Sequence, residues 1–193
     1  RHTVLNELGS YCVLLPSEAG DRRQHVLDMF FDSIADRYDQ LIDVPRNIEN
    51  IRNLESTLRS HGAFSAHSTI LDYGCGTGLS YQVRDILPVV PIGYDRCPIM
   101  RRQARLRGLD VWTPEELLAR PFGTIDAVFA SYVFHLIPDL SEVESVWRRM
   151  RPGALLGANL HKCLGSERLI TAMVAIGAEQ LGSFPHDRRH GEY

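Results

Sequence analysis

Two stretches in the first third of the chain carry apolar residues at helical spacing. The first stripe comprises Leu27, Phe30, Phe31, Ile34, Tyr38 and Leu41, and the second, after Pro45, comprises Ile48, Ile51, Leu54 and Leu58. Steps of three and four residues place such side chains on one face of an α-helix. We therefore expect a helix from Val26 to about residue 41 and a second that ends at Gly62. Residues 1–24 show weak periodicity and are expected to form an extended or partly ordered arm.

After residue 62 the pattern changes to short apolar runs separated by helical segments. Strands are expected at 70–72, 88–95, 109–112, 124–130 and 154–160, with helices at 79–87, 98–107, 141–150 and 166–181. Two capping boxes, at Thr113–Glu116 and Ser141–Glu144, favour helix starts. Consecutive strand–helix units force parallel pairing through right-handed crossovers. The fold class predicted is α/β, with a doubly wound, mostly parallel sheet.

A glycine-rich turn follows the first of these strands. Residues 70–80 read ILDYGCGTGLS, with glycine at positions 74, 76 and 78. Glycine lets the backbone bend sharply and approach a ligand closely, since it has no Cβ. Asp72 places a carboxylate beside this turn, and the amide groups that open the next helix face the same space. The turn predicts a nucleoside-cofactor site at the carboxyl end of the first strand.

A second acidic residue, Asp95, ends the next predicted strand, 21 positions beyond Gly74. A carboxylate in that position can accept both hydroxyl groups of a ribose. A dinucleotide-binding turn would carry its third glycine at position 79, which is Leu79 here. This departure disfavours a nicotinamide or flavin dinucleotide.

Residues 70–78 match the pattern (V/I)LDxGCGTG, the first motif of the Rossmann-like (class I) S-adenosylmethionine-dependent methyltransferases, and the chain resembles that family over most of residues 26–181. The resemblance implies S-adenosylmethionine as cofactor and S-adenosylhomocysteine as product. It assigns cofactor contacts to the turn residues Asp72, Gly74, Cys75, Gly76 and Gly78. Residues 93–98 resemble the second motif, in which Asp95 holds the ribose and Arg96 lies beside it.

Three further segments extend the resemblance. Residues 31–39 are similar to a segment FDxxAxxYD that folds over the cofactor as part of a lid, which places Tyr38 against the ligand. Residues 131–139 resemble the stretch lining the cleft between cofactor and substrate, with Ser131 and Tyr132 at its start. After the third strand the family usually carries an acidic residue at the adenine amino group. Here Thr113 stands at that position, and Trp112 is expected to form an apolar wall.

Methyl transfer to oxygen usually needs a base, because the acceptor must lose a proton. His135 and His161 each follow a predicted strand end on the cofactor's side of the sheet, and imidazole has a suitable pKa. We take these two as candidate catalytic residues, with Tyr132 and Asp139 as lesser ones. The histidines are dispersed and no metal-binding pattern is visible, so no metal is expected.

Composition narrows the function classes. The 193 residues are 44% hydrophobic and 23% charged, with a net charge of -3, which is not the basic footprint of a nucleic-acid-binding protein. No apolar run approaches a membrane span. Four scattered cysteines suit reduced thiols, so a cytoplasmic protein is expected. The expected partner is a small-molecule methyl acceptor, not a nucleic acid or a membrane, and a homodimer is left open.

The domain prediction is one methyltransferase domain over residues 1–193, made of an arm (1–24), a helical lid (25–62) and a cofactor-binding core (68–181). Residues 182–193 are too few for the two antiparallel strands with which the family's fold ends, so these strands are expected to be abbreviated or truncated. Two other functions are weighed. One is a non-catalytic, methyltransferase-like binding or partner subunit, and the other is a nucleotide-dependent oxidoreductase.

Overall fold

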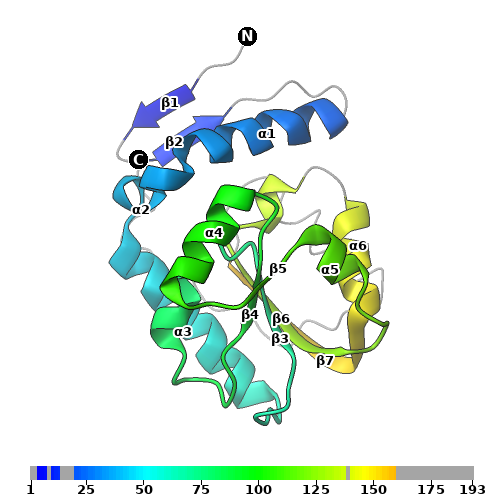
Figure 1. Ribbon diagram of the computed structural model, residues 1–193. Helices are drawn as coiled ribbons and strands as arrows, with labels where there is room; N and C mark the ends of the chain where they lie inside the picture. Colours follow the sequence, from blue (N-terminus) through cyan, green and yellow to red (C-terminus); the bar gives the residue numbers. More distant parts are fainter. Residues whose placement is uncertain (1–3, 8–9, 14–19, 138–139, 160–193) are drawn as a thin grey trace. The chain divides into compact units, whose positions relative to one another are not determined.

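A five-stranded parallel sheet forms the core of the chain. The computed structural model describes residues 4–7, 10–13, 20–137 and 140–159. Its sheet is ordered β5-β4-β3-β6-β7, and every neighbouring pair is parallel (Figure 1). The strands are β3 (Ile70–Tyr73), β4 (Ile92–Tyr94), β5 (Val111–Trp112), β6 (Ile125–Ser131) and β7 (Met150–Asn159). Because the strand order reverses at β3, the sheet is doubly wound, which confirms the predicted fold class.

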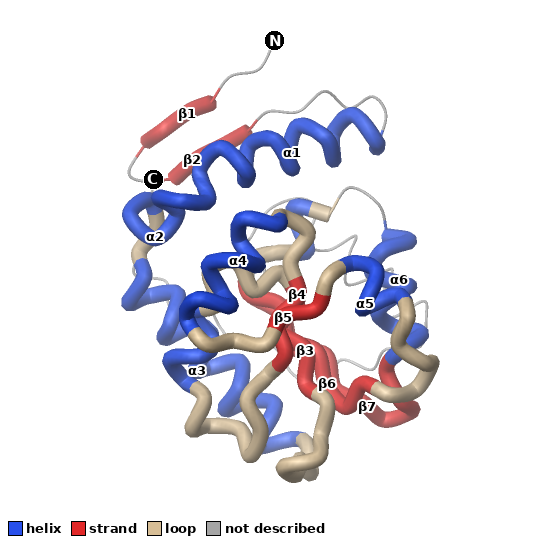
Figure 2. The backbone as a smooth tube through the Cα atoms, viewed as in Figure 1, coloured by secondary structure: helices blue, strands red, loops and turns tan. Residues whose placement is uncertain are grey.

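Helices cover both faces of this sheet. On one face lie α3 (Val44–His61), the short 3-10 helix η2 (Leu79–Val83) and α4 (Pro98–Arg107), and on the other lie α5 (Pro114–Leu118) and α6 (Leu140–Arg149). In Figures 1 and 2, α3 and α4 are to the left of the strands, and α5 and α6 are to the right. Every residue of β3 is buried as a result. The apolar stripe of α3 packs on Ile70 and Phe129, so the expected helix contributes to the core.

The segment before α3 contains two elements that were not predicted individually. Two short strands, β1 (Val4–Glu7) and β2 (Ser10–Val13), pair antiparallel within the stretch expected to be an extended or partly ordered arm. Strands of four residues are too short for periodicity to reveal. The first lid helix, α1 (Gly20–Ile34), begins before Val26. A 3-10 turn, η1 (Ala35–Arg37), separates it from α2 (Tyr38–Leu41).

Prolines shorten two elements relative to the prediction. The second strand covers three residues of the expected 88–95, because neither Pro88 nor Pro91 has an amide hydrogen for the ladder. The helix expected at 79–87 is only the five-residue η2. Pro88 disfavours helical backbone at Leu87, so the helical segment cannot continue to residue 87 as predicted.

At the far edge, β7 begins earlier than the expected residue 154. Met150 pairs with Ile125, and the next pair is Leu155 with Ala127, so four residues of β7 lie opposite the single residue Asp126 of β6 in an irregular bulge. Helix α6 begins at Leu140, which places Ser141 inside the helix rather than at its N-cap. Glu144 instead pairs with Arg148 one turn later at 2.6 Å.

The remaining boundaries follow the capping chemistry. Helix α4 ends at Gly108, whose φ of 101° is left-handed, and Thr113 forms the predicted capping box with Glu116. None of the described helices combines the length and apolar character needed to cross a bilayer. The predicted helix 166–181 and the C-terminal strands lie outside the described residues. All described residues belong to one unit, Arg1–Leu160, so a single domain over 1–193 stays a prediction.

Candidate functional site

The glycine turn follows β3 at the carboxyl edge of the sheet. Gly74, Gly76 and Gly78 have φ values of 75°, 52° and 81°, in the left-handed region that glycine adopts without strain. A Cβ on Gly78 would lie 2.8 Å from the Ala104 backbone, and one on Gly74 would lie 2.2 Å from Val133. The turn is therefore pressed between α4 and the loop after β6, and glycine is required by space as well as by conformation.

The amide groups of this turn are used inside the protein. Gly74 and Cys75 both donate to the carbonyl oxygen of Tyr94, at 2.7 and 2.9 Å, and the amide of Gly78 donates to the Cys75 carbonyl at 2.9 Å. The amide of Gly76 donates to the side chain of Asp95. A pyrophosphate held by this turn would need these donors, and they already have acceptors. These four amide groups are therefore not free to bind a phosphate.

Asp95 lies against the turn from the neighbouring strand, directly after β4. One carboxylate oxygen accepts the Gly76 amide at 2.9 Å, and the other accepts the Cys97 amide at 2.9 Å. Burial raises the pKa of Asp95 to about 6, and the two amide donors oppose this shift. Each oxygen retains a second lone pair, so the carboxylate can still accept bonds from hydroxyl groups.

Asp72 is buried beneath the same edge. It is 3% exposed and precedes Tyr73, the last residue of β3. Burial raises the pKa of Asp72 to about 7, the nearby Ser80 hydroxyl lowers it, and the negative charge of Asp95 raises it further. The Ser80 hydroxyl is buried and has no partner within strict hydrogen-bond geometry among the described residues. A buried carboxylate and a buried hydroxyl thus lie close together under the turn.

The end of β6 contributes Ser131 and Tyr132. The Ser131 hydroxyl is buried and has no partner among the described residues. Tyr132 has a φ of 60°, the one non-glycine residue with positive φ in the described part of the chain. Such a conformation costs roughly 1–3 kcal/mol and is concentrated at functional sites. The Asn50 amide of α3 donates to the Tyr132 hydroxyl at 3.2 Å, which ties the strained loop to the helix.

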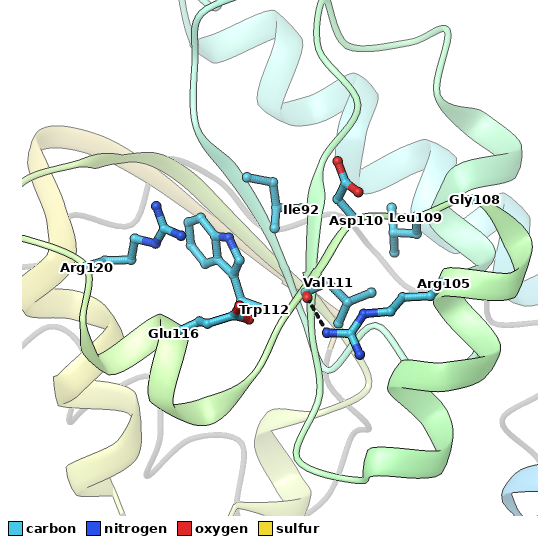
Figure 3. Close-up of a pocket in the computed structure, with 9 residues that line it drawn as sticks. All are labelled: Ile92, Arg105, Gly108, Leu109, Asp110, Val111, Trp112, Glu116 and Arg120. Carbon is cyan, nitrogen blue, oxygen red and sulfur yellow. Dashed lines mark hydrogen bonds between the residues drawn. The ribbon is translucent and has the colours of Figure 1, made fainter.

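Trp112 and Thr113 occupy the outer edge of the sheet. Trp112 carries the Arg120 guanidinium 4.2 Å above its ring and lines a cavity of about 620 Å³. Figure 3 shows this cavity and the bond from Arg105 to the Val111 carbonyl, 2.8 Å long. The Thr113 hydroxyl accepts the Glu116 amide in the capping box. Both residues follow the third strand as expected, and their contact with adenine stays a prediction.

Two other predicted residues have structural partners. The Cys75 thiol is buried with Ala104, Leu109 and Val111 and donates to the Gly76 carbonyl at 3.8 Å, so it serves the packing of the turn. Arg96 forms ion pairs with Glu142 of α6 at 2.7 Å and with Asp28 of α1 at 3.6 Å. Arg96 thus links α1 of the lid to α6, which covers the face of the sheet opposite α3 and α4.

Tyr38, at the start of α2, lies over the turn. Its ring is 4.0 Å from the position that a Cβ on Gly76 would take. Burial, followed by the charges of Asp95 and Asp39, raises the pKa of its hydroxyl to about 12. Of the three turn glycines, Gly76 is therefore the one that faces the lid.

The candidate bases are less fully placed. The backbone of His135 lies in the 3-10 helix η3 (Phe134–Leu136), which follows β6 on the carboxyl edge of the sheet. Its side chain, and all of Asp139 and His161, lie outside the described residues. No group of histidine, cysteine and carboxylate side chains in the described part of the chain is arranged to hold a metal ion.

Sequence reasoning missed one polar cluster and one buried carboxylate near this site. Glu142 accepts the Tyr73 hydroxyl at 2.5 Å and the Tyr94 hydroxyl at 3.0 Å, and those two rings stack with centroids 4.9 Å apart. The tyrosines end β3 and β4, so parallel register alone could have paired them. Glu55 of α3 is fully buried. Glu55 lies four residues after Ile51 and three before Leu58, on the buried side of the helix. This spacing could have predicted that its side chain is buried.

Comparison with known proteins shows the fold. No protein-family model and no curated protein sequence matches the chain. Among solved structures, one similar chain is from the complex between the Haloferax volcanii Trm112 methyltransferase activator and a methyltransferase. It has a TM-score of 0.51 and 20% identity over 66% of this chain and 58% of that one. Another is Haemonchus contortus phosphoethanolamine N-methyltransferase 1, solved with phosphoethanolamine and S-adenosylhomocysteine. It has a TM-score of 0.50 and 11% identity over 69% of this chain and 31% of that one.

The chain thus spans about three fifths and one third of the lengths of these two proteins. At such low identities the likeness concerns the fold alone. The strand order around β3 and the position of the glycine turn agree with it. The chain has the Rossmann-like fold of the class I S-adenosylmethionine-dependent methyltransferases.

Proposed function

We propose that the chain is an S-adenosylmethionine-dependent methyltransferase that acts on a small molecule. The observation that carries this proposal is the position of Asp95, whose carboxylate lies on the Gly76 amide at 2.9 Å. A ligand that rests on the turn would present its ribose hydroxyl groups to this carboxylate. The solved Haemonchus relative contains S-adenosylhomocysteine, which favours this cofactor for a chain of the same fold.

The residues around the turn suit that cofactor. Asp95 would bind the ribose, and the Ser131 hydroxyl, which has no partner among the described residues, would serve the polar methionine end together with Ser80. Tyr38 would cover the ligand, and Trp112 with Thr113 would lie toward the adenine. When bound, S-adenosylmethionine supplies a methyl group activated by its sulfonium charge. The chain's own contribution would be to align the acceptor and to exclude water.

An oxidoreductase is the weaker alternative. Binding of a dinucleotide pyrophosphate uses free amide groups at the turn, and here the amides of Gly74, Cys75, Gly76 and Gly78 already donate to protein acceptors. Leu79 also stands where a third glycine would be expected.

Calorimetric titration with S-adenosylhomocysteine and with NAD tests the proposal. We expect S-adenosylhomocysteine to bind and NAD not to bind. A preference for NAD would support the oxidoreductase, and binding of neither would support a partner subunit without a cofactor. Either of these outcomes would contradict the proposed function.

Replacement of Asp95 by alanine should weaken S-adenosylhomocysteine binding roughly ten- to a hundred-fold. Hydrogen bonds to a charged group contribute about 1.5–3 kcal/mol, and the variant loses the acceptor of the ribose. Since Asp95 also accepts two backbone amides, Asp95→Asn is the companion variant, because it retains one oxygen acceptor. The exposed Asp85, between η2 and β4, provides the control Asp85→Ala. An unchanged dissociation constant in folded Asp95→Ala protein would remove Asp95 from the site.

A further inference from the structure

The lid presents a row of aspartates to the core. Successive members are separated by four, four and three residues, so they share one side of the α1–η1–α2 segment. Each has a partner on α4 or on the loops beside it. The pairs are Asp28 with Arg96, Asp32 with the Cys97 thiol, Asp36 with Gln103, and Asp39 with Thr77 and Arg107.

Asp39 differs from the other three because its partner belongs to the glycine turn. The Thr77 hydroxyl donates to one Asp39 oxygen at 2.6 Å, and an Arg107 nitrogen pairs with the other. A second Arg107 nitrogen donates to the Thr77 hydroxyl at 3.3 Å. Three segments that are distant in sequence, namely the lid, the turn and the end of α4, are thus joined in one closed network, the Asp39 latch.

This latch fixes the neighbour of Asp39. Tyr38 is next in the chain, and its ring lies over Gly76. Thr77, directly after Gly76, is 4% exposed, so the latch forms at the base of the lid rather than on its outer surface. The contact between Asp39 and Thr77 lies one residue from Tyr38 in the lid and one residue from Gly76 in the turn. It therefore holds Tyr38 over the turn.

The backbone leaves the helical path on both sides of α2. Ile34 and Arg37 have φ values of -112° and -120°, and Ile42 is extended with φ of -115° and ψ of 159°. Arg37 and Ile42 thus interrupt the helical path before and after the four residues of α2, whereas Ile34 ends α1. A change at these points can swing Tyr38 and Asp39 away without unwinding α1 or α3.

We propose that Asp39 is a positioning residue that latches Tyr38 over the glycine turn and thereby sets the rate at which the cofactor enters and leaves. The proposal rests on the proposed function for the identity of the cofactor. The Tyr38 ring occupies the space directly over Gly76, so a ligand can reach this part of the turn only if the latch opens. Loss of the latch should raise the population of the open lid and speed both binding and release.

The first test is stopped-flow measurement of S-adenosylhomocysteine binding and release. Asp39→Asn keeps the size of the side chain and removes its charge, and Arg107→Lys keeps the charge but loses the paired geometry. We expect release from Asp39→Asn to be about ten-fold faster, because the pair is partly exposed and its strength is modest. Arg107→Lys should show a smaller increase in the same direction.

The matched control is Asp36→Asn, which makes the same charge change on the same side of the lid. Asp36 is exposed and bonds Gln103 at 3.3 Å, away from the turn, so its variant should keep wild-type rates. Equal release rates in wild type and Asp39→Asn would overturn the proposal. A loss of thermal stability in Asp39→Asn with unchanged rates would also overturn it, since the contact would then be structural only.

A second measurement does not depend on the cofactor. Amide hydrogen exchange over residues 35–42, in the free protein, should be faster in Asp39→Asn than in Asp36→Asn. If the wild-type protein fails to bind S-adenosylhomocysteine but shows this difference, the latch stands and the proposed function falls. If binding is observed without any difference in exchange or rates, the proposed function stands and the latch falls.

Discussion

Replacement of Glu55 by glutamine should stabilise the protein at pH 8 and flatten the pH dependence of its unfolding. Glu55 is 0% exposed on the buried side of α3, and both of its carboxylate oxygens lack a partner among the described residues. Burial raises its pKa to about 8, and the negative charges of Asp72 and Asp85 add to the shift, while Arg52 lowers it. The folded protein therefore favours the protonated, uncharged form of Glu55.

The direction of the pH effect follows from this shift. The folded-state pKa lies above the ordinary value of 4.5, so the folded protein binds the proton more tightly than the unfolded chain does. The contribution of Glu55 to the free energy of unfolding is full below about pH 4.5, and it is lost as the pH rises through about 8. At 1.36 kcal/mol for each pKa unit, the loss is at most about 5 kcal/mol.

The free energy of unfolding, measured by denaturant titration between pH 5 and 9, checks this prediction. Glu55→Gln should lose less stability than the wild type over this range, and Glu55→Leu should lose equally little, because neither variant ionises. Glu49→Gln is the matched control, since Glu49 lies on the exposed side of the same helix. If Glu55→Gln and the wild type lost stability in parallel with pH, Glu55 would not be the titrating group.

Local signals explain which parts of this site the sequence could predict. The glycine turn needs left-handed backbone at three fixed positions, and Asp95 directly follows the short strand β4. Residues close in sequence therefore define both features. The Thr113 capping box is equally local. Such features are visible without knowledge of the tertiary structure.

The partners of these residues could not be predicted in the same way. Glu142 meets Tyr73 across 69 residues, and Arg107 meets Asp39 across 68. Their pairing depends on which face of the sheet each helix covers, and that is decided by packing of the whole fold. The second strand was predicted too long because the apolar residues Val89 and Val90 suggested a strand. The strand begins later because Pro88 and Pro91 have no amide hydrogen to donate to a neighbouring strand.

The last prediction concerns His135, which we propose as the general base for an oxygen acceptor. Its backbone follows β6 by four residues, and Val133, two residues before it, packs on Gly74. Because β6 pairs with β3, this segment lies at the same edge of the sheet as the glycine turn. A base placed there would lie near a ligand held by the glycine turn.

His135→Gln should lower turnover about 10²–10⁴-fold and leave S-adenosylhomocysteine affinity unchanged, since general-base assistance contributes that factor. The deficit should shrink as pH rises, because an acceptor hydroxyl ionises unaided there. Single-turnover methyl transfer at two pH values, with the acceptor found by a labelled-cofactor screen, measures both effects. His67→Gln is the control, because His67 is exposed in the loop before the amino end of β3. Equal rates in wild type and His135→Gln at both pH values would leave alignment of the acceptor, rather than proton removal, as the source of the rate.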